Sequence, residues 1–141
     1  MGPKKGPDGT LAFTLPMGDK KLPGIAAEDI GKCAFGILKK GSEFIGKTVG
    51  IAGEHLTGSQ MAAALTKALG REVRYNAVSP EAYRGFGFPG AEDLGNMFQF
   101  KRDFEQVFCG ARNLDVARAL NPSLQTFDTW LAQNKSRIPL A

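Results

Sequence analysis

The stretch GFGFPGAEDLGNMF, residues 85–98, decides how the middle of this chain is interpreted, because its first six residues match the dinucleotide-binding pattern G-x-G-x-x-G. A phosphate-binding loop of that kind follows a strand and opens a helix. Here the preceding residues 79–84 predict a helix, and Pro89 removes one backbone N–H that could bind phosphate. The stretch therefore predicts a turn between two helices, with packed phenylalanines.

Acidic residues around this turn also oppose nucleotide binding. Glu92 and Asp93 fall in the first turn of the next predicted helix, where they complement the helix dipole and would repel a pyrophosphate. Glu105 stands where an acid could bind a ribose, but no second strand is predicted to carry it.

Hydrophobic periodicity and helix caps predict short strands separated by helices, followed by an almost wholly helical C-terminal half. Strands are expected at residues 10–15, 20–25, 46–53 and 72–78. Helices are expected at residues 26–40, 57–69, 79–84, 91–104, 114–120 and 126–134. Four short strands are too few to build a complete doubly wound sheet. The pattern therefore indicates the later part of a larger α/β architecture.

Composition indicates one folded domain and excludes several classes of protein. The net charge of +4 comes from cations interspersed with acids, which argues against direct nucleic-acid binding. No window is apolar enough to span a membrane, and the N-terminus lacks the apolar segment of a secretory signal. Cys33 and Cys109 lie far apart and are expected to be free thiols. These observations favour an intracellular protein.

No set of residues predicts a catalytic or metal site. Four residues after Tyr75 and Tyr83 stand Ser79 and Gly87, so the Tyr-x-x-x-Lys pair of short-chain reductases is missing. His55 is the only histidine, and with two scattered cysteines it gives too few ligands for zinc.

The helix expected at residues 26–40 opens with Glu28 and Asp29 in its first turn. Asp19 and these two acids are nearest a strand-to-helix transition, yet complementing the helix dipole explains the pair better than catalysis. The apolar residues at helical spacing are expected to face the core: Ile30, Cys33, Ile37 and Leu38.

Several segments together resemble, in order and spacing, the C-terminal half of NmrA-like proteins of the HSCARG type, in the atypical short-chain dehydrogenase/reductase superfamily. They are residues 15–19 (LPMGD), 27–31 (AEDIG), 87–98 (GFPGAEDLGNMF) and 126–131 (TFDTWL). The resemblance covers essentially the whole chain, and residues 87–98 are its most specific part.

The resemblance implies an α/β fold, α+β in isolation, that forms the C-terminal part of an NAD(P)-binding Rossmann-like fold. A few short strands and about five or six helices are then expected, without the N-terminal nucleotide-binding half. Residues 1–56 would end the Rossmann-like part, and residues 57–141 would form a smaller, mostly helical domain within one NmrA-like C-terminal region.

The family is associated with redox sensing rather than catalysis, through changes of partner with the NADPH/NADP balance. The resemblance therefore implies a non-enzymatic, truncated regulator, cytoplasmic and also nuclear, that contacts other proteins or copies of itself, without direct nucleic-acid or membrane contact. NADP(H) would be the cofactor of full-length members, and none is expected on this chain alone. The residues expected at a pocket or partner contact are Phe86, Phe88, Met97 and Phe98.

Two alternatives remain open from the sequence. One is the remnant of an oxidoreductase whose cofactor half is missing, and the other is a small-molecule-binding α+β module with a pocket lined by Phe86, Phe88 and Phe98. If a larger sheet is incomplete, the strand at residues 10–15 should expose an edge, and apolar helix faces should lose their cover. Self-association or low stability would follow.

Overall fold

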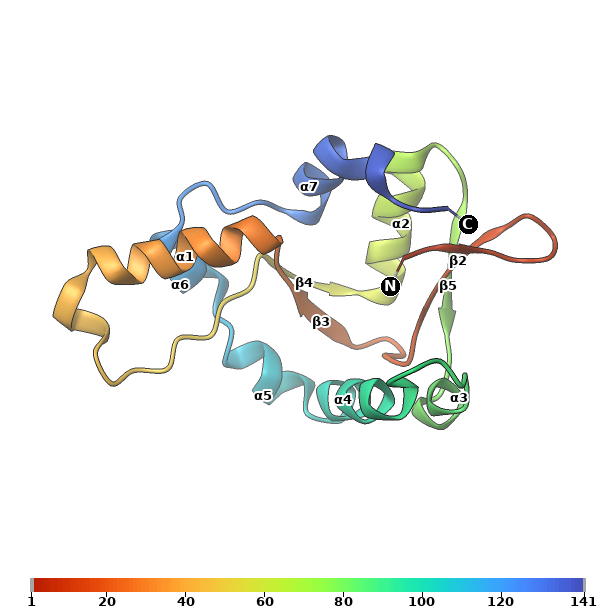
Figure 1. Cartoon of the computed structure of the whole chain (residues 1–141), viewed down its shortest axis with the longest axis horizontal. Coiled ribbons are helices and arrows are strands. Elements are labelled where there is room, and N and C mark those ends of the chain that lie inside the picture. The colour runs from red at the N-terminus through yellow and green to blue at the C-terminus, as the bar shows by residue number, and fades with distance from the viewer. Residues whose placement is uncertain (1, 141) are drawn as a thin grey trace.

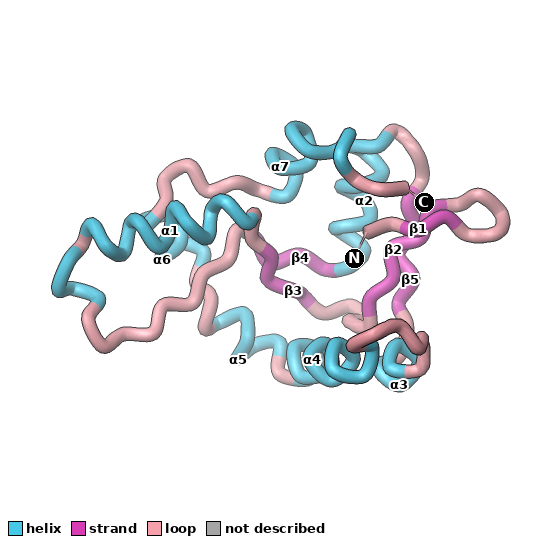
Figure 2. The backbone as a smooth tube through the Cα atoms, viewed as in Figure 1, coloured by secondary structure: helices cyan, strands magenta, loops and turns pink. Residues whose placement is uncertain are grey.

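The computed structural model describes residues 2–140, and its helices lie on either side of short strands (Figure 1 and Figure 2). The strands are β1 (Lys4–Lys5), β2 (Leu11–Leu15), β3 (Lys21–Gly24), β4 (Glu54–Thr57) and β5 (Val73–Ala77). The helices are α1 (Ala27–Lys39), α2 (Gly58–Leu69), α3 (Pro80–Arg84), α4 (Ala91–Asp103), α5 (Glu105–Gly110), α6 (Leu114–Leu120) and α7 (Phe127–Asn134), with 3-10 turns at Gly41–Phe44 and Lys135–Arg137. The mixed α/β fold matches the prediction from the sequence.

The strands form two small sheets. β2 lies in the middle of the first sheet, antiparallel to β1 and parallel to β5, while β3 and β4 form a separate antiparallel pair. The expectation that residues 10–15 expose a strand edge is only partly right. β5 pairs with all five residues of β2, whereas β1 pairs only with Leu11 and Ala12, so residues 13–15 have no strand partner on that side within residues 2–140.

β2 joins two hydrophobic cores. Its alternate residues Leu11 and Leu15 are both buried, and side chains two apart on a strand point to the same face. Leu11 belongs to a core with Ala62, Leu65, Val73 and Leu131, which come from α2, β5 and α7. Leu15 belongs to a second core with Met17, Tyr83 and Phe98, which come from the following turn, α3 and α4. One strand therefore fixes helices on both sides of the molecule.

Helix starts and ends largely follow the sequence signals. In α2, the Thr57 hydroxyl accepts from Gln60 N at 3.2 Å, and the Gln60 side chain accepts from Thr57 N at 2.9 Å, which completes the predicted capping box. Gly70 ends this helix with a positive φ of 65°. Ser79 caps α3 by accepting from Ala82 N.

The glycine-rich stretch forms a turn between α3 and α4, as the sequence predicts. Gly87 and Gly90 adopt φ angles of 70° and 84°, which side chains rarely tolerate. Gly95 lies buried where α4 meets α3, and a Cβ atom there would collide with the Arg84 side chain. Gly87 and Gly90 therefore allow the chain to turn, and Gly95 allows α3 and α4 to pack closely.

The strand expected at residues 46–53 is wrong. These residues include no strand, because no neighbouring strand pairs with them within residues 2–140; the pairing begins at Glu54, opposite Gly24 of β3. Gly50 instead packs so closely on the main chain of Ala111 that a Cβ atom would not fit. Alternating apolar residues indicated an extended chain but not its pairing.

The helix at residues 26–40 is confirmed as α1, but its core-facing assignment is only partly right. Cys33 is buried, whereas Ile30 and Leu38 are exposed and Ile37 is half-buried. α1 rests on α6 through Gly36, where a Cβ atom would collide with the Leu120 carbonyl oxygen. Ile30 and Leu38 of α1 therefore lie open to solvent in the described chain. No helix within residues 2–140 has the length and apolar character needed to cross a bilayer.

Asp29 holds α1 to the segment between α6 and α7. Its buried carboxylate accepts from Asn121 Nδ2 at 3.1 Å and from Gln125 N at 2.8 Å, and Lys32 Nζ lies at 3.5 Å. Burial by itself raises the pKa of this carboxyl, but the hydrogen bonds from Gln125 and Asn121 outweigh it and hold the pKa below its ordinary 3.8. The sequence predicted only that Asp29 complements the helix dipole. The structure shows that Asp29 also holds α1 to the segment between α6 and α7.

Replacing Asp29 with alanine should lower the free energy of unfolding by about 3 kcal/mol, because it leaves a buried donor of Asn121 and a part-buried donor of Gln125 without their charged acceptor. The measurement is chemical denaturation of both proteins at neutral pH. The difference between them should shrink as the pH falls through the lowered pKa, because protonation then removes the same charge from the wild type.

Asp93 provides a matched control, because it follows the same Ala-Glu dipeptide at the third position of α4 but is exposed. Asp93→Ala should cost less than about 1 kcal/mol, the usual range of a helix-dipole interaction. An equal loss of unfolding free energy in the two variants would contradict the proposal that Asp29 holds α1 to the segment between α6 and α7.

Candidate ligand cavity and exposed aromatic surface

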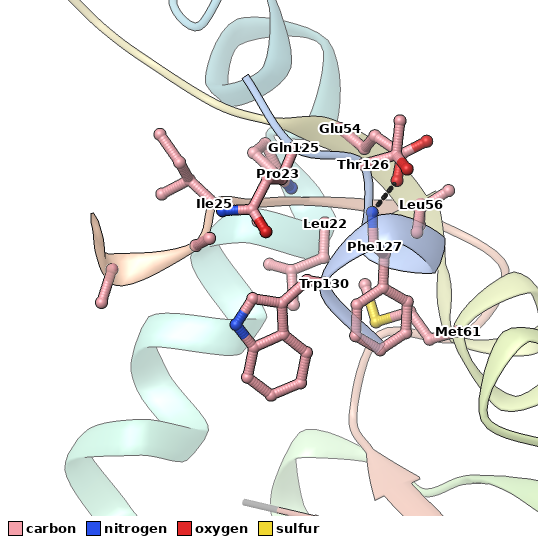
Figure 3. A pocket seen from close by; sticks show the side chains of 13 residues that line it. Leu22, Pro23, Ile25, Glu54, Leu56, Met61, Gln125, Thr126, Phe127 and Trp130 are labelled. Carbon is pink, nitrogen blue, oxygen red and sulfur yellow. Dashed lines mark hydrogen bonds between the residues drawn. The ribbon is translucent and has the colours of Figure 1, made fainter. Parts of the chain in front are cut away.

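A cavity of about 380 Å³ lies between the β3–β4 pair, α2 and α7 (Figure 3). Its wall is mostly apolar and includes Leu22, Leu56, Met61, Phe127 and Trp130. Pockets of a few hundred cubic ångströms with apolar walls and few polar groups are typical of small-molecule sites.

Two contacts fix the aromatic side of this cavity. Thr126 caps α7 by accepting from Thr129 N at 3.1 Å, and Glu54 Oε2 accepts from Phe127 N at 2.6 Å. Phe127 and Trp130, one helical turn apart, have nearly parallel rings, with an interplanar angle of 12° and centroids 6.4 Å apart. The carboxylate also complements the positive end of the helix.

Gln125 brings a polar atom to the cavity. Its backbone N–H donates to Asp29, and its Nε2 donates to Glu28 Oε1 at 2.9 Å. Its Oε1 is buried and has no hydrogen-bond partner within residues 2–140. In the view of Figure 3 this oxygen is directed toward Trp130. A buried acceptor without a donor carries a desolvation cost, which a donor on a bound molecule would relieve.

A second feature is an exposed apolar area on α4 and α5, here termed the α4–α5 surface and defined by Phe100, Phe104 and Val107. These side chains are 52%, 54% and 68% exposed, and the rings of Phe100 and Phe104 are 5.1 Å apart. Figure 1 shows the two helices nearly in line along one edge of the molecule, on the opposite side from α2 and α7.

Two cations lie beside the α4–α5 surface. Arg112 stacks 3.6 Å from the centroid of Phe108, and Lys101 Nζ lies 5.1 Å from the same ring. Burial, with a smaller contribution from the Arg112 charge, lowers the pKa of Lys101. The surface therefore combines exposed aromatic rings with positive charge.

The four residues expected at a contact lie apart from the cavity. Phe98 is buried in the core, with its ring edge-on to Tyr83, whereas Phe86 and Phe88 are 49% and 39% exposed around the same tyrosine. Met97 is half-buried, and its sulfur lies 3.4 Å from Lys101 Nζ. The structure thus joins three of them around Tyr83, and Phe88 also lines a shallow hollow at the start of α4.

The cavity residues were missed by sequence reasoning. Leu22, Glu54 and Gln125 come from segments separated by tens of residues, and none belongs to a recognisable motif. Two signals pointed to one wall of the cavity: the cap at Thr126, which predicted the helix that carries Trp130, and the family resemblance of residues 126–131.

His55 and Glu105 are both engaged in structural contacts. His55 Nε2 bonds the Arg112 carbonyl oxygen at 2.9 Å, and Glu105 Oε1 accepts from Lys21 N at 2.6 Å. Burial raises the pKa of both cysteine thiols, Cys33 and Cys109. Within residues 2–140, no group of three or more His, Cys, Asp or Glu residues could hold a metal ion.

The fold is a small mixed α/β structure that matches part of a Rossmann-like architecture. The chain belongs to the NmrA-like family, whose model matches residues 2–131. A mutant of NmrA itself superimposes with a TM-score of 0.73 and 26% identity, over 92% of this chain and 44% of that one.

The chain is also similar to two curated proteins and shares its fold with a reductase of known structure. Prestalk A differentiation protein A of Dictyostelium discoideum is 28% identical over 67% of this chain and 34% of its own length. NmrA-like family domain-containing protein 1 of Rattus norvegicus is 42% identical over 40% of this chain and 32% of its own. Triphenylmethane reductase of Citrobacter sp., complexed with NADP(H), shares the fold with a TM-score of 0.71 and 21% identity, over 86% of this chain and 44% of that one. The chain thus spans about a third of the length of these two relatives and under half of the solved structures.

Replacing Glu54 with alanine should loosen α7 from β4. We expect a loss of about 1 to 2 kcal/mol in unfolding free energy, because a charge-assisted hydrogen bond is removed. Emission from Trp130, the only tryptophan, should shift to the red as water reaches the ring. Glu72→Ala is the control: Glu72 is exposed and pairs only with Arg74 in the structure, so neither property should change appreciably. A blue shift or an unchanged spectrum in Glu54→Ala would contradict this role.

Proposed function

We propose that this chain is a non-enzymatic regulatory protein of NmrA-like type that acts by contacting other proteins, including copies of itself. The observation that carries the proposal is the exposed apolar area of a folded chain. Five of its ten phenylalanines are more than a third exposed, and two of them form the α4–α5 surface. Contiguous apolar patches rimmed by polar groups commonly mark protein interfaces.

The chemistry of the α4–α5 surface supports a protein partner. Aromatic rings and arginine are enriched at the centres of protein interfaces, and here Arg112 already stacks on Phe108 next to the exposed rings. The partner surface should be apolar at its centre and should carry carboxylates opposite Lys101 and Arg112.

The proposal that the chain is not an enzyme rests on the hydrogen bonding and pKa values of its tyrosine and cysteine side chains. Tyr75 O–H donates to the Gly18 carbonyl oxygen at 2.9 Å, and burial raises the pKa of this phenol, so it is poorly suited to give up its proton. Both thiols have raised pKa values and are protonated near neutral pH. NmrA, one structural neighbour, is described as a negative transcriptional regulator.

Redox sensing through NADP(H) is the finer part of the proposal. NmrA has been crystallised with NAD and with NADP, and this chain covers 44% of those structures. Within the chain, the one G-x-G-x-x-G match is a turn between helices, and two acids lie in the first turn of the helix that follows it. We therefore propose that cofactor binding in this family depends on parts of those proteins that the chain does not match.

An oxidoreductase remnant is the second candidate. Its support is the likeness to reductases such as the NADP(H)-bound triphenylmethane reductase, which at 21% identity indicates the fold alone. No residue in the described part of the chain adds to it.

The α4–α5 surface predicts self-association of the purified chain. Sedimentation velocity over a concentration series should show a reversible dimer or larger species. Phe100→Ser combined with Val107→Ser should weaken it at least tenfold, because two apolar anchors are lost. The thermal midpoint should change little, since both side chains are more than half exposed.

Phe35→Ser combined with Leu38→Ser provides a matched control, because it removes two exposed apolar residues from α1 instead. It should leave the association constant unchanged. A wild-type chain that stays monomeric at high concentration with a cooperative melt, or equal weakening by both double variants, would contradict the surface proposed here.

NADPH should not bind to this chain alone. A titration followed by the cofactor's fluorescence should show no saturation up to about 100 μM, far above the micromolar constants typical of specific cofactor sites. A complete NmrA-family protein titrated in parallel provides the positive control. Saturable micromolar binding to the chain would overturn this part of the proposal.

A further inference from the structure

We propose that the cavity between the β3–β4 pair and α7 is a binding site for a small, uncharged aromatic molecule that carries one O–H or N–H donor. The donor would bind Gln125 Oε1, and the aromatic body would lie against Trp130 and Phe127. The site is independent of the α4–α5 surface.

The walls of the cavity determine the apolar part of the ligand. Leu22, Leu56 and Met61 line the cavity together with the two aromatic rings, and its volume of about 380 Å³ is large enough for one or two fused rings. Flat aromatic molecules gain most in such a space, because offset stacking or edge contacts with the Trp130 ring add to the burial of apolar surface.

The orientation of the Gln125 amide determines the polar part. Its Nε2 donates to Glu28 Oε1, and an ionised carboxylate can only accept, so the amide cannot turn over without losing this hydrogen bond. Gln125 lines the cavity, and its Oε1 therefore stays directed toward Trp130 (Figure 3), buried and without a partner in the described chain. The ligand must supply a donor, since an acceptor would leave two unpaired oxygens facing one another.

Nearby charge excludes anions. The cavity is lined by the Glu54 carboxylate, and the Glu28 carboxylate lies behind the Gln125 amide. No lysine or arginine is among the lining residues. A carboxylate or phosphate would be repelled at this site, whereas a neutral phenol, indole or aniline would not.

The test uses 2-naphthol and 2-methoxynaphthalene, which share the same rings but differ in the donor. Isothermal titration calorimetry of the full chain should show binding of 2-naphthol that is about fivefold tighter than binding of 2-methoxynaphthalene, the usual effect of one net hydrogen bond. Both ligands should quench the emission of Trp130, which is the only tryptophan and therefore places the ligand in the cavity.

Gln125→Met removes the acceptor and keeps the backbone N–H that bonds Asp29. It should bring the affinities for the two ligands within about twofold of each other, by weakening 2-naphthol alone. Gln133→Met makes the same change at an exposed position of α7 away from the cavity, and it should preserve the fivefold difference.

Ala26→Leu, which adds bulk to the cavity wall, should weaken both ligands, and its melting curve shows whether the fold is retained. The proposal is overturned if neither ligand binds below millimolar concentration, if binding leaves Trp130 emission unchanged, or if the two ligands bind equally to the wild type. It is also overturned if 2-naphthoate, which carries a negative charge, binds as tightly as 2-naphthol.

Discussion

The buried carboxylate of Asp29 is the constraint on which the arrangement of the C-terminal segments depends. A charge without solvent must be paired and hydrogen-bonded, and here its donors come from Asn121 and Gln125, more than ninety residues further along the chain. Satisfying it fixes the chain between α6 and α7. The start of α7 then follows from Thr126 and Glu54, which places Trp130 over the cavity. Asp29 of α1 therefore positions Gln125, which carries the polar atom of the proposed ligand site. Through the chain that follows, it also helps to position the Trp130 ring.

The two proposed binding regions share one structural element. Leu22 of β3 lines the cavity, while the preceding Lys21 donates its backbone N–H to Glu105 of α5, next to the α4–α5 surface. Figure 1 shows the β3–β4 pair between α7 above and α5 below. The apolar cavity and the aromatic surface are thus on opposite sides of the same short strand pair, each held to it by a carboxylate that accepts a backbone hydrogen bond: Glu54 on one side and Glu105 on the other.

Local signals predicted most of the helices, because caps such as Thr57, Ser79 and Thr126 act within a few residues. Local signals failed where contacts between residues far apart in the sequence determine the structure. Residues 46–53 have the alternation of a strand but lack a partner strand, and α5 was not anticipated. Asp29 resembled an ordinary first-turn acid, like Asp93, since its bonding partners lie in another part of the sequence. The cavity could not be predicted either, because its lining residues come from distant parts of the sequence. The resemblance to a family identified the fold but did not indicate where the cavity lies.

The parallel pairing of β2 with β5 also bears on how the chain reaches its native state. Thr14 and Asn76, neighbours across this pair, are 62 residues apart in sequence, so a long loop must close before either hydrophobic core can be completed. Loop closure of this length is entropically unfavourable, and non-local strand pairs form more slowly than helices. α2, with its capping box, can form early as a local unit. The slow step of folding should therefore be the arrival of β5 beside β2, after which both cores consolidate together because they share that strand.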